Sequence, residues 1–176
     1  NVAIGKGALS SEDTGDNNVA IGHGALQTAN FDGSAYNVAI GADAGKLVST
    51  GVRNTLIGSL AGSSLTTGSY NTALGYGALF TEDENGGNTA IGYQALVTQN
   101  AGADAYNVAV GASAGAQVTT GTNNTIIGGL AGDALTTGFA NVAIGYNASG
   151  ATTIANNNVA IGVNALSTED AHGRNV

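Results

Sequence analysis

The chain of 176 residues contains no cysteine, no proline, no methionine and no tryptophan. Without cysteine it has neither a disulfide scaffold nor a cysteine-ligated zinc or iron–sulfur site. Charged residues make up only 9% of the chain, against roughly 25% in typical soluble proteins. No apolar run approaches the roughly 18 residues of a membrane-spanning helix. These absences argue against a disulfide-stabilised domain and against a transmembrane segment.

Basic residues are also scarce. Lys6, Lys46, Arg53 and Arg174 stand against twelve acidic residues, so the net charge is −8. Nucleic acids and anionic membranes attract clustered lysine and arginine. We therefore expect no nucleic-acid partner and no membrane insertion by this segment, and we assign the excess of acid to solubility.

What the chain has in abundance is glycine and asparagine, 29 and 20 residues, and they are arranged in a repeat. The unit opens Asn-(Val/Thr)-(Ala/Leu/Ile)-(Ile/Val/Leu)-Gly and continues x-x-Ala. Its opening asparagines are Asn1, Asn18, Asn37, Asn54, Asn71, Asn88, Asn107, Asn124, Asn141 and Asn158, and an eleventh unit begins at Asn175. Units are 17 residues long, except for the two of 19 that begin at Asn18 and Asn88.

A longer period groups these units in fours. Positions 1–70 match positions 71–140 at 39 of 70 places. Both ends of the sequence fall inside a repeat, and neither resembles the atypical capping unit that a solenoid needs. We expect 1–176 to be a single repeat array taken from a longer fibrous protein.

The start of each unit alternates in the manner of a short β-strand. In 18–22, for example, Val19 and Ile21 share one face, and Asn18, Ala20 and Gly22 share the other. A second apolar stretch such as 25–26 and a polar turn complete the unit, which predicts two short strands and two turns in each coil. The expected fold is an all-β parallel β-solenoid of about ten coils.

Both strand faces are apolar. We place on the outer side of the rod the face that carries Ala3, Ala20, Ala39, Leu56 and Ile126. An exposed apolar stripe of this length needs a partner, and a closed symmetric homo-oligomer would bury it.

Three places are invariant in all ten units: the opening Asn, the Gly four residues on and the Ala three residues after that. Stacked asparagines can form a ladder of amide hydrogen bonds. The glycine predicts a bend with positive φ or a close approach of two backbones, and the alanine leaves room for a neighbouring coil or chain. The predicted ladder and bend residues include Asn18, Asn37, Asn54, Asn71, Asn88, Asn107, Asn124, Asn141, Asn158, Gly22, Gly41, Gly92 and Gly111.

The motif Asn-(Val/Thr)-Ala-Ile-Gly-x-x-Ala-Leu, seen in 18–26 and 88–96, resembles the head repeats of trimeric autotransporter adhesins of the YadA type. It is more similar still to the "NTAIGYQAL" repeats of phage tail fibres and large bacterial surface proteins. The resemblance covers essentially the whole chain. It implies a left-handed β-roll, a homotrimer, an extracellular location and a receptor-binding fibre, although the coils here are longer than the short adhesin head coil.

Candidate chemical residues are few. His23 occupies the sixth place of a unit, where residues of every kind occur, so we expect it to be exposed and idle, and likewise His172. Acidic pairs at the twelfth and thirteenth places (12–13, 82–84 and 169–170) could hold calcium or act as paired carboxylates. Coils far apart cannot share one ion, so we predict solvated turns. We expect no catalytic residue, no metal site and no cofactor.

Six tyrosines remain. Tyr76, Tyr93 and Tyr146 share the sixth place and could stack on a sugar ring or contact a protein, although plain packing is the alternative. Tyr36, Tyr70 and Tyr106 precede an opening asparagine and should cover a turn.

The function favoured by these features is a structural and adhesive fibre segment that attaches in multivalent fashion to a cell-surface glycan or protein. A self-assembling extracellular filament and a lone solenoid such as an ice-binding protein are the alternatives. Threonine pairs at 66–67, 119–120 and 136–137 support the ice-binding reading only in part, because several coils lack them. A left-handed β-helix acyltransferase and a tailspike glycosidase fit less well: the hexapeptide pattern fails after its first copy, and the chain has no tryptophan.

Overall fold

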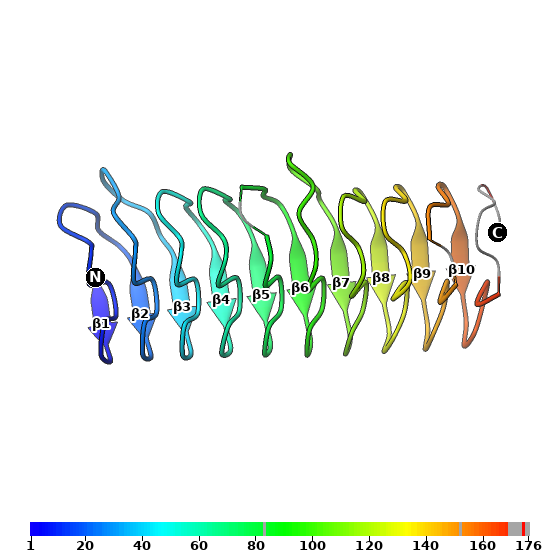
Figure 1. The fold of residues 1–176 in the computed structure, drawn as a ribbon, viewed down its shortest axis with the longest axis horizontal. Helices are drawn as coiled ribbons and strands as arrows, with labels where there is room; N and C mark the ends of the chain where they lie inside the picture. The colour runs from blue at the N-terminus through cyan, green and yellow to red at the C-terminus, as the bar shows by residue number, and fades with distance from the viewer. Residues whose placement is uncertain (83, 152, 169–173, 175–176) are drawn as a thin grey trace.

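A computed structural model describes residues 1–82, 84–151, 153–168 and 174. Each repeat unit forms one coil, numbered 1 to 10 from the unit that begins at Asn1, and each coil contributes one strand to a single parallel sheet in chain order (Figure 1). The strands are β1 (Val2–Ile4), β2 (Val19–Ile21), β3 (Val38–Ile40), β4 (Thr55–Ile57), β5 (Thr72–Leu74), β6 (Thr89–Ile91), β7 (Val108–Val110), β8 (Thr125–Ile127), β9 (Val142–Ile144) and β10 (Val159–Ile161). The parallel β-solenoid expected from the sequence is confirmed.

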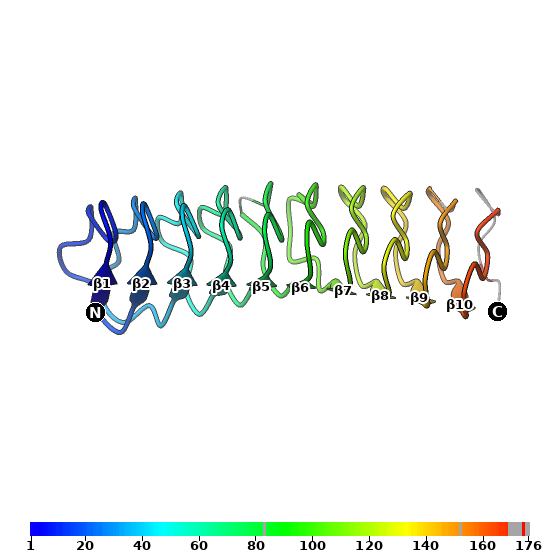
Figure 2. The same cartoon turned by 90° about the horizontal axis from the view of Figure 1, so that it is seen from below.

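The molecule is a rod with the sheet along one side. Equivalent residues pair between neighbouring coils, as in Val2↔Val19 and Ala3↔Ala20, so the repeat fixes the register. Seen at right angles to the first view, the strands line one edge and the turns stand on the other (Figure 2). The two coils of 19 residues carry the tallest loops, beside β2 and β6 in Figure 1. The tips of these loops, residues 32–34 and 102–104, are exposed.

The prediction of a second strand in each coil is wrong for the described residues. The stretch at 25–26 lies in a turn, although its backbone still bonds to neighbouring coils: the Leu26 amide donates to the Ala44 carbonyl at 3.1 Å. The reason is the backbone conformation. Gly22, Gly24 and Leu26 have φ of 136°, 66° and 49°, and a chain with repeated positive φ cannot keep the pleat of a strand.

The asparagines form the predicted ladder. In all nine steps between successive coils, the side-chain Oδ1 of one opening asparagine accepts a hydrogen bond from the backbone N–H of the next, at 2.8–3.1 Å. The side-chain amide then donates across its own coil, as from Asn54 to the Gly68 carbonyl at 2.9 Å. From coil 2 to coil 10 these asparagines are buried. Each one therefore ties its coil to the next and also closes its own turn.

The fifth-place glycines meet both predicted requirements. Gly41 has φ of 135°, and a Cβ built on it would lie 2.6 Å from the carbonyl carbon of Gly58 in the next coil. Gly22, Gly92 and Gly111 have the same positive φ and the same close approach to the following glycine. Only glycine allows adjacent coils to approach this closely.

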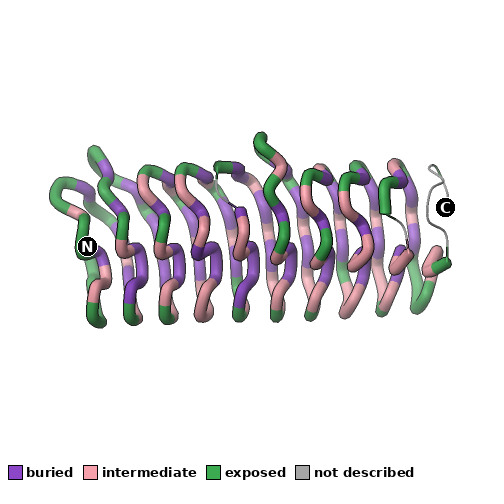
Figure 3. The backbone as a smooth tube through the Cα atoms, in the orientation of Figure 1, coloured by how far each residue is buried: buried purple, intermediate pink, exposed green. Residues whose placement is uncertain are grey.

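The assignment of the strand faces is wrong and must be inverted. Ala20, Ala39, Leu56 and Ile126 are fully buried, whereas the residues on either side of them in the strands are half-buried or exposed. The interior is too narrow for a large aliphatic residue in every coil, so it is filled mainly by alanine and by one larger side chain per level. The invariant alanines leave room for the neighbouring coil, not for another chain: Ala25, like its equivalents in coils 3 to 9, is fully buried. Figure 3 shows buried segments recurring at matching places along the rod.

Candidate ligand-binding site

The outward face of the sheet is a continuous aliphatic surface, here called the outer stripe. It consists of the fourth-place residues Ile4, Ile21, Ile40, Ile57, Leu74, Ile91, Val110, Ile127, Ile144 and Ile161, flanked by Val or Thr at the second place. Leu74 is 43% exposed and Ile161 is 65% exposed. Since neighbouring coils are in register, ten such side chains stand in a row on one side of the rod.

A second surface lies on the turn that follows the strands, where the sixth-place residues emerge. Tyr76 and Tyr93 come from successive coils, and their rings stack with centroids 5.8 Å apart and planes 12° apart. Both rings stay about half exposed, at 50% and 53%. Tyr146 occupies the same place in coil 9 and is 56% exposed, but its neighbour on the side of coil 8 is Gly129. The structure therefore brings Tyr76 and Tyr93 together and leaves Tyr146 apart from them.

A hollow of about 250 Å³ opens beside Tyr76. Its walls come from coils 4, 5 and 6: Leu60, Tyr76, Gly77, Phe80, Gln94 and Val97. Gly77 gives the stem of Gln94 its space, because a Cβ at Gly77 would lie 3.6 Å from the Gln94 Cγ. The hollow thus combines an aromatic face, aliphatic walls and one amide that can both donate and accept hydrogen bonds.

The surroundings of this hollow are uncharged. The turns that carry it span 58–64, 75–81 and 92–98, and none of them contains Asp, Glu, Lys, Arg or His. The nearest charges on equivalent turns are in coil 3, where Asp43 lies 3.3 Å from Lys46, and in coil 8, where burial raises the pKa of Asp133 above its ordinary value. A ligand held in the hollow would meet no formal charge.

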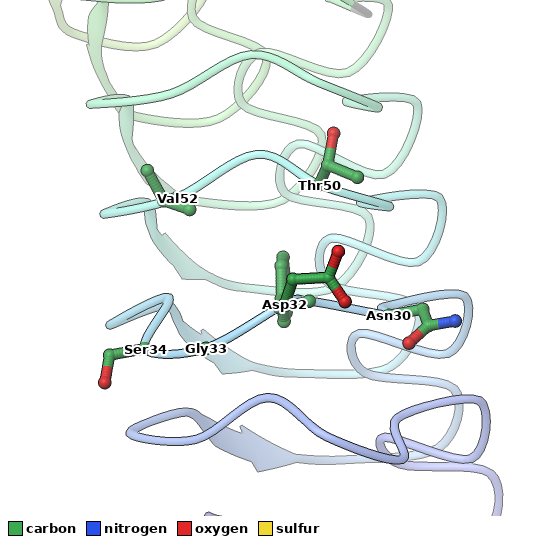
Figure 4. Close-up of a pocket in the computed structure, with 7 residues that line it drawn as sticks. Asn30, Asp32, Gly33, Ser34, Thr50 and Val52 are labelled. Atoms are coloured by element: carbon green, nitrogen blue, oxygen red, sulfur yellow. The ribbon is translucent and has the colours of Figure 1, made fainter.

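A second hollow, of about 260 Å³, lies between the tall loop of coil 2 and the next coil (Figure 4). Asn30, Asp32 and Thr50 supply polar atoms to its lining. Asn30 and Ser34 lie at opposite ends, with their polar atoms directed away from each other, and the Ser34 hydroxyl accepts a hydrogen bond from Asn17 at 2.9 Å. The polar groups do not converge, so this hollow is the weaker candidate.

The prediction for the acidic pairs is wrong at the twelfth place. Glu82 is fully buried, and its carboxylate accepts hydrogen bonds from Asn85 and, at 3.3 Å, from the Asn88 side chain. Glu12 is half-buried and accepts from the backbone of Gly15 and Phe31. Both acids precede a coil of 19 residues. In coil 6 the Asn88 side-chain amide donates to the Glu82 carboxylate, not to a carbonyl of its own turn.

The thirteenth-place Asp13 and the following Glu84 are exposed as predicted, while 83 and 169–170 lie outside the described residues. His23 is exposed as predicted, and its Nδ1 lies 3.7 Å from the Asp43 carboxylate. His172 lies outside the described residues. Within the described part of the chain, no three His, Asp or Glu side chains gather in a way that could hold a metal ion.

Two of the tyrosines that precede a coil contact the turns, as predicted. Tyr106 lies over Gly87, and its hydroxyl donates to Asp104 at 3.2 Å; this hydrogen bond and the carboxylate charge raise the pKa of Tyr106. The Tyr70 hydroxyl accepts from Arg53 at 2.7 Å. Tyr36 is 54% exposed. The stack of Tyr76 and Tyr93 could be foreseen from their identical place in adjacent units, but the hollow beside them needs Leu60 and Phe80, which no sequence motif marks.

The described residues include no helix, and therefore none that is long and apolar enough to cross a membrane. Comparison of the chain with family models, with curated proteins and with solved structures gives no match.

Proposed function

We propose that the chain is a stiff shaft segment of an extracellular attachment fibre, either a phage tail fibre or a bacterial surface adhesin. In this proposal the segment works as a homotrimer, and the outer stripe is buried between the three chains. The observation that carries the proposal is the stripe itself. A row of ten aliphatic side chains on one face of a rod is larger than the scattered apolar residues of an ordinary monomer surface.

The rest of the rod suits this role. The asparagine ladder and the close glycine contacts repeat in every step between coils, so bending would strain the same bonds throughout the rod. Three parallel copies would present every surface feature three times, and weak single contacts with a cell-surface glycan or protein would then add through effective concentration. The repeat motif resembles fibre and adhesin repeats, which supports the same reading.

An ice-binding role is less well supported. Such a surface needs free hydroxyls in a flat array, but the hydroxyls of Ser49, Thr119 and Thr136 at the thirteenth place donate to carbonyls of the following coil at 2.9–3.3 Å.

The absence of cysteine allows a direct test of the packing face. In Ile57→Cys the new thiol stands on the outer stripe, and treatment with a short bis-maleimide should link chains into dimers on a denaturing gel. The control is Thr67→Cys, at an exposed residue outside the stripe, which should stay largely unlinked. Equal linking of the two variants, or none for Ile57→Cys, would contradict the proposed packing.

A further inference from the structure

We infer that the hollow beside Tyr76 binds one neutral pyranose ring of a glycan, with the apolar face of the sugar on the Tyr76 ring and its hydroxyls on the Gln94 amide. The inference gives a ligand class to the attachment function and rests on that proposal for its biological setting. Three features of the hollow carry it: its platform, its size and its charge.

The platform is an aromatic ring that is already held in place. The Tyr93 ring stacks on Tyr76 from the next coil, so a ligand does not have to order a freely rotating side chain. Tyrosine offers a broad apolar face at low entropic cost, and the exposed half of the Tyr76 ring is open to solvent. Within one coil, Phe80 and Tyr76 both line the hollow, and Leu60 and Val97 close it from the neighbouring coils.

The size and the polar lining fit a single ring. A volume of about 250 Å³ lies just under the roughly 300–1,000 Å³ of sites for drug-sized ligands. Gln94 supplies one planar amide, with two donors and one acceptor oxygen, which matches neighbouring hydroxyls of a sugar. Gln94 has φ of 53°, a conformation in which glycine or asparagine is usual; the equivalent residues of coils 1, 2 and 5 are Gly7, Gly24 and Gly77. Coil 6 thus presents a long amide side chain where those three coils have none.

The charge selects a neutral sugar. The turns around the hollow carry no charged residue, and the whole chain has a net charge of −8. An acidic sugar would find no basic partner in the hollow and would be repelled by the rest of the rod.

The test uses the intact chain and a panel of methyl glycosides of glucose, galactose, mannose and N-acetylglucosamine, followed by ligand-detected NMR. N-acetylneuraminic acid serves as the anionic comparison. We expect at least one neutral glycoside to bind with a Kd in the millimolar range, and Tyr76→Ala and Gln94→Gly each to weaken it roughly tenfold. Gln94→Gly suits the positive φ, so the backbone should be retained.

The matched control is Tyr146→Ala, which removes an equally exposed tyrosine from the same place in a coil without a stacked neighbour. It should leave glycoside binding unchanged, and melting curves of all variants report their folding. Failure of every neutral glycoside to bind at about 50 mM, binding of the anionic sugar alone, or an equal loss in Tyr146→Ala would overturn the inference.

The hollow is built by one chain, so the outcome is separable from the proposed assembly. A monomeric chain that binds a neutral glycoside would keep this inference and overturn the trimer. A trimer that binds none of the glycosides would do the reverse.

Discussion

At the scale of single residues, the opening asparagine is the main connector of the rod. Its Oδ1 accepts from the next coil, its side-chain amide donates to a carbonyl of its own turn, and its backbone carbonyl accepts from the previous coil, as Asn54 does from Val38 at 2.8 Å. Aspartate would lack the donor, and serine would not reach both partners. This explains why asparagine fills the place in all ten units.

Removal of one rung should therefore be costly. In Asn124→Ala the Asn141 backbone N–H and the Gly138 carbonyl lose their partners, and each buried unpaired group costs about 1–3 kcal/mol. We expect the free energy of unfolding to fall by about 2–4 kcal/mol and the melting temperature by roughly 4–12 °C, measured by circular dichroism. Exposed Asn30→Ala is the control and should melt within about 2 °C of the parent chain; equal shifts in the two variants would contradict the ladder account.

At the scale of the coil, the interior is filled by exchange of volume between two places. Coils 4 and 8 have Leu56 and Ile126 at the third place, where the other coils have alanine, and glycine at the ninth place. A Cβ on Gly62 would lie 2.8 Å from the Leu56 Cδ2, and one on Gly45 would lie 2.7 Å from the Leu56 Cδ1. One large side chain therefore occupies the space above two glycines.

This exchange predicts a coupled pair of substitutions. Leu56→Ala should lower the free energy of unfolding by about 2–5 kcal/mol by leaving a cavity, and Gly62→Leu should lower it by about 1–3 kcal/mol or more by overpacking. The double variant Leu56→Ala/Gly62→Leu reproduces the pairing of Ala73 with Leu79 in coil 5. It should lose less than the sum of the two single variants, by at least about 1 kcal/mol in a double-mutant cycle followed by urea unfolding. Strict additivity would show that the two places do not share one space.

Much of the coil could be predicted from the sequence, because a repeat places like residues above each other. The strand, the asparagine ladder and the glycine bend all follow from residues that recur at fixed spacing. The strand faces could not be assigned from alternation alone, since both faces are apolar. The signal that decides between them is the pairing of Leu56 with Gly62 and of Ile126 with Gly132, which shows that the third and ninth places compete for one interior.

The burial of Glu82 had a similar signal. The equivalent residues of coils 3, 4, 7 and 8 are Val48, Leu65, Val118 and Leu135, all aliphatic and buried. A place with those occupants faces inward whichever residue fills it. The acid in coil 5 is instead tied to its neighbour, because coil 6 has two extra residues and its asparagine turns to the Glu82 carboxylate for an acceptor. Charge alone was a poor guide to exposure here.

At the scale of the whole molecule, the rod satisfies its backbone from coil to coil but leaves its outer stripe unpartnered within one chain. Turns, ladder and interior are complete without a second copy, so the fold does not depend on assembly for its hydrogen bonds. The stripe is the one continuous apolar surface that the described residues leave open, and the proposed fibre function requires it to be covered by other copies of the chain.

The solution mass of this segment, measured by light scattering after size exclusion, tests that requirement most directly. The account predicts a mass three times the chain mass of 17.0 kDa, and a shift toward the single-chain mass when Ile40 and Ile57 on the stripe are both replaced by lysine. A parent chain that elutes at the single-chain mass across a range of concentrations would contradict the account.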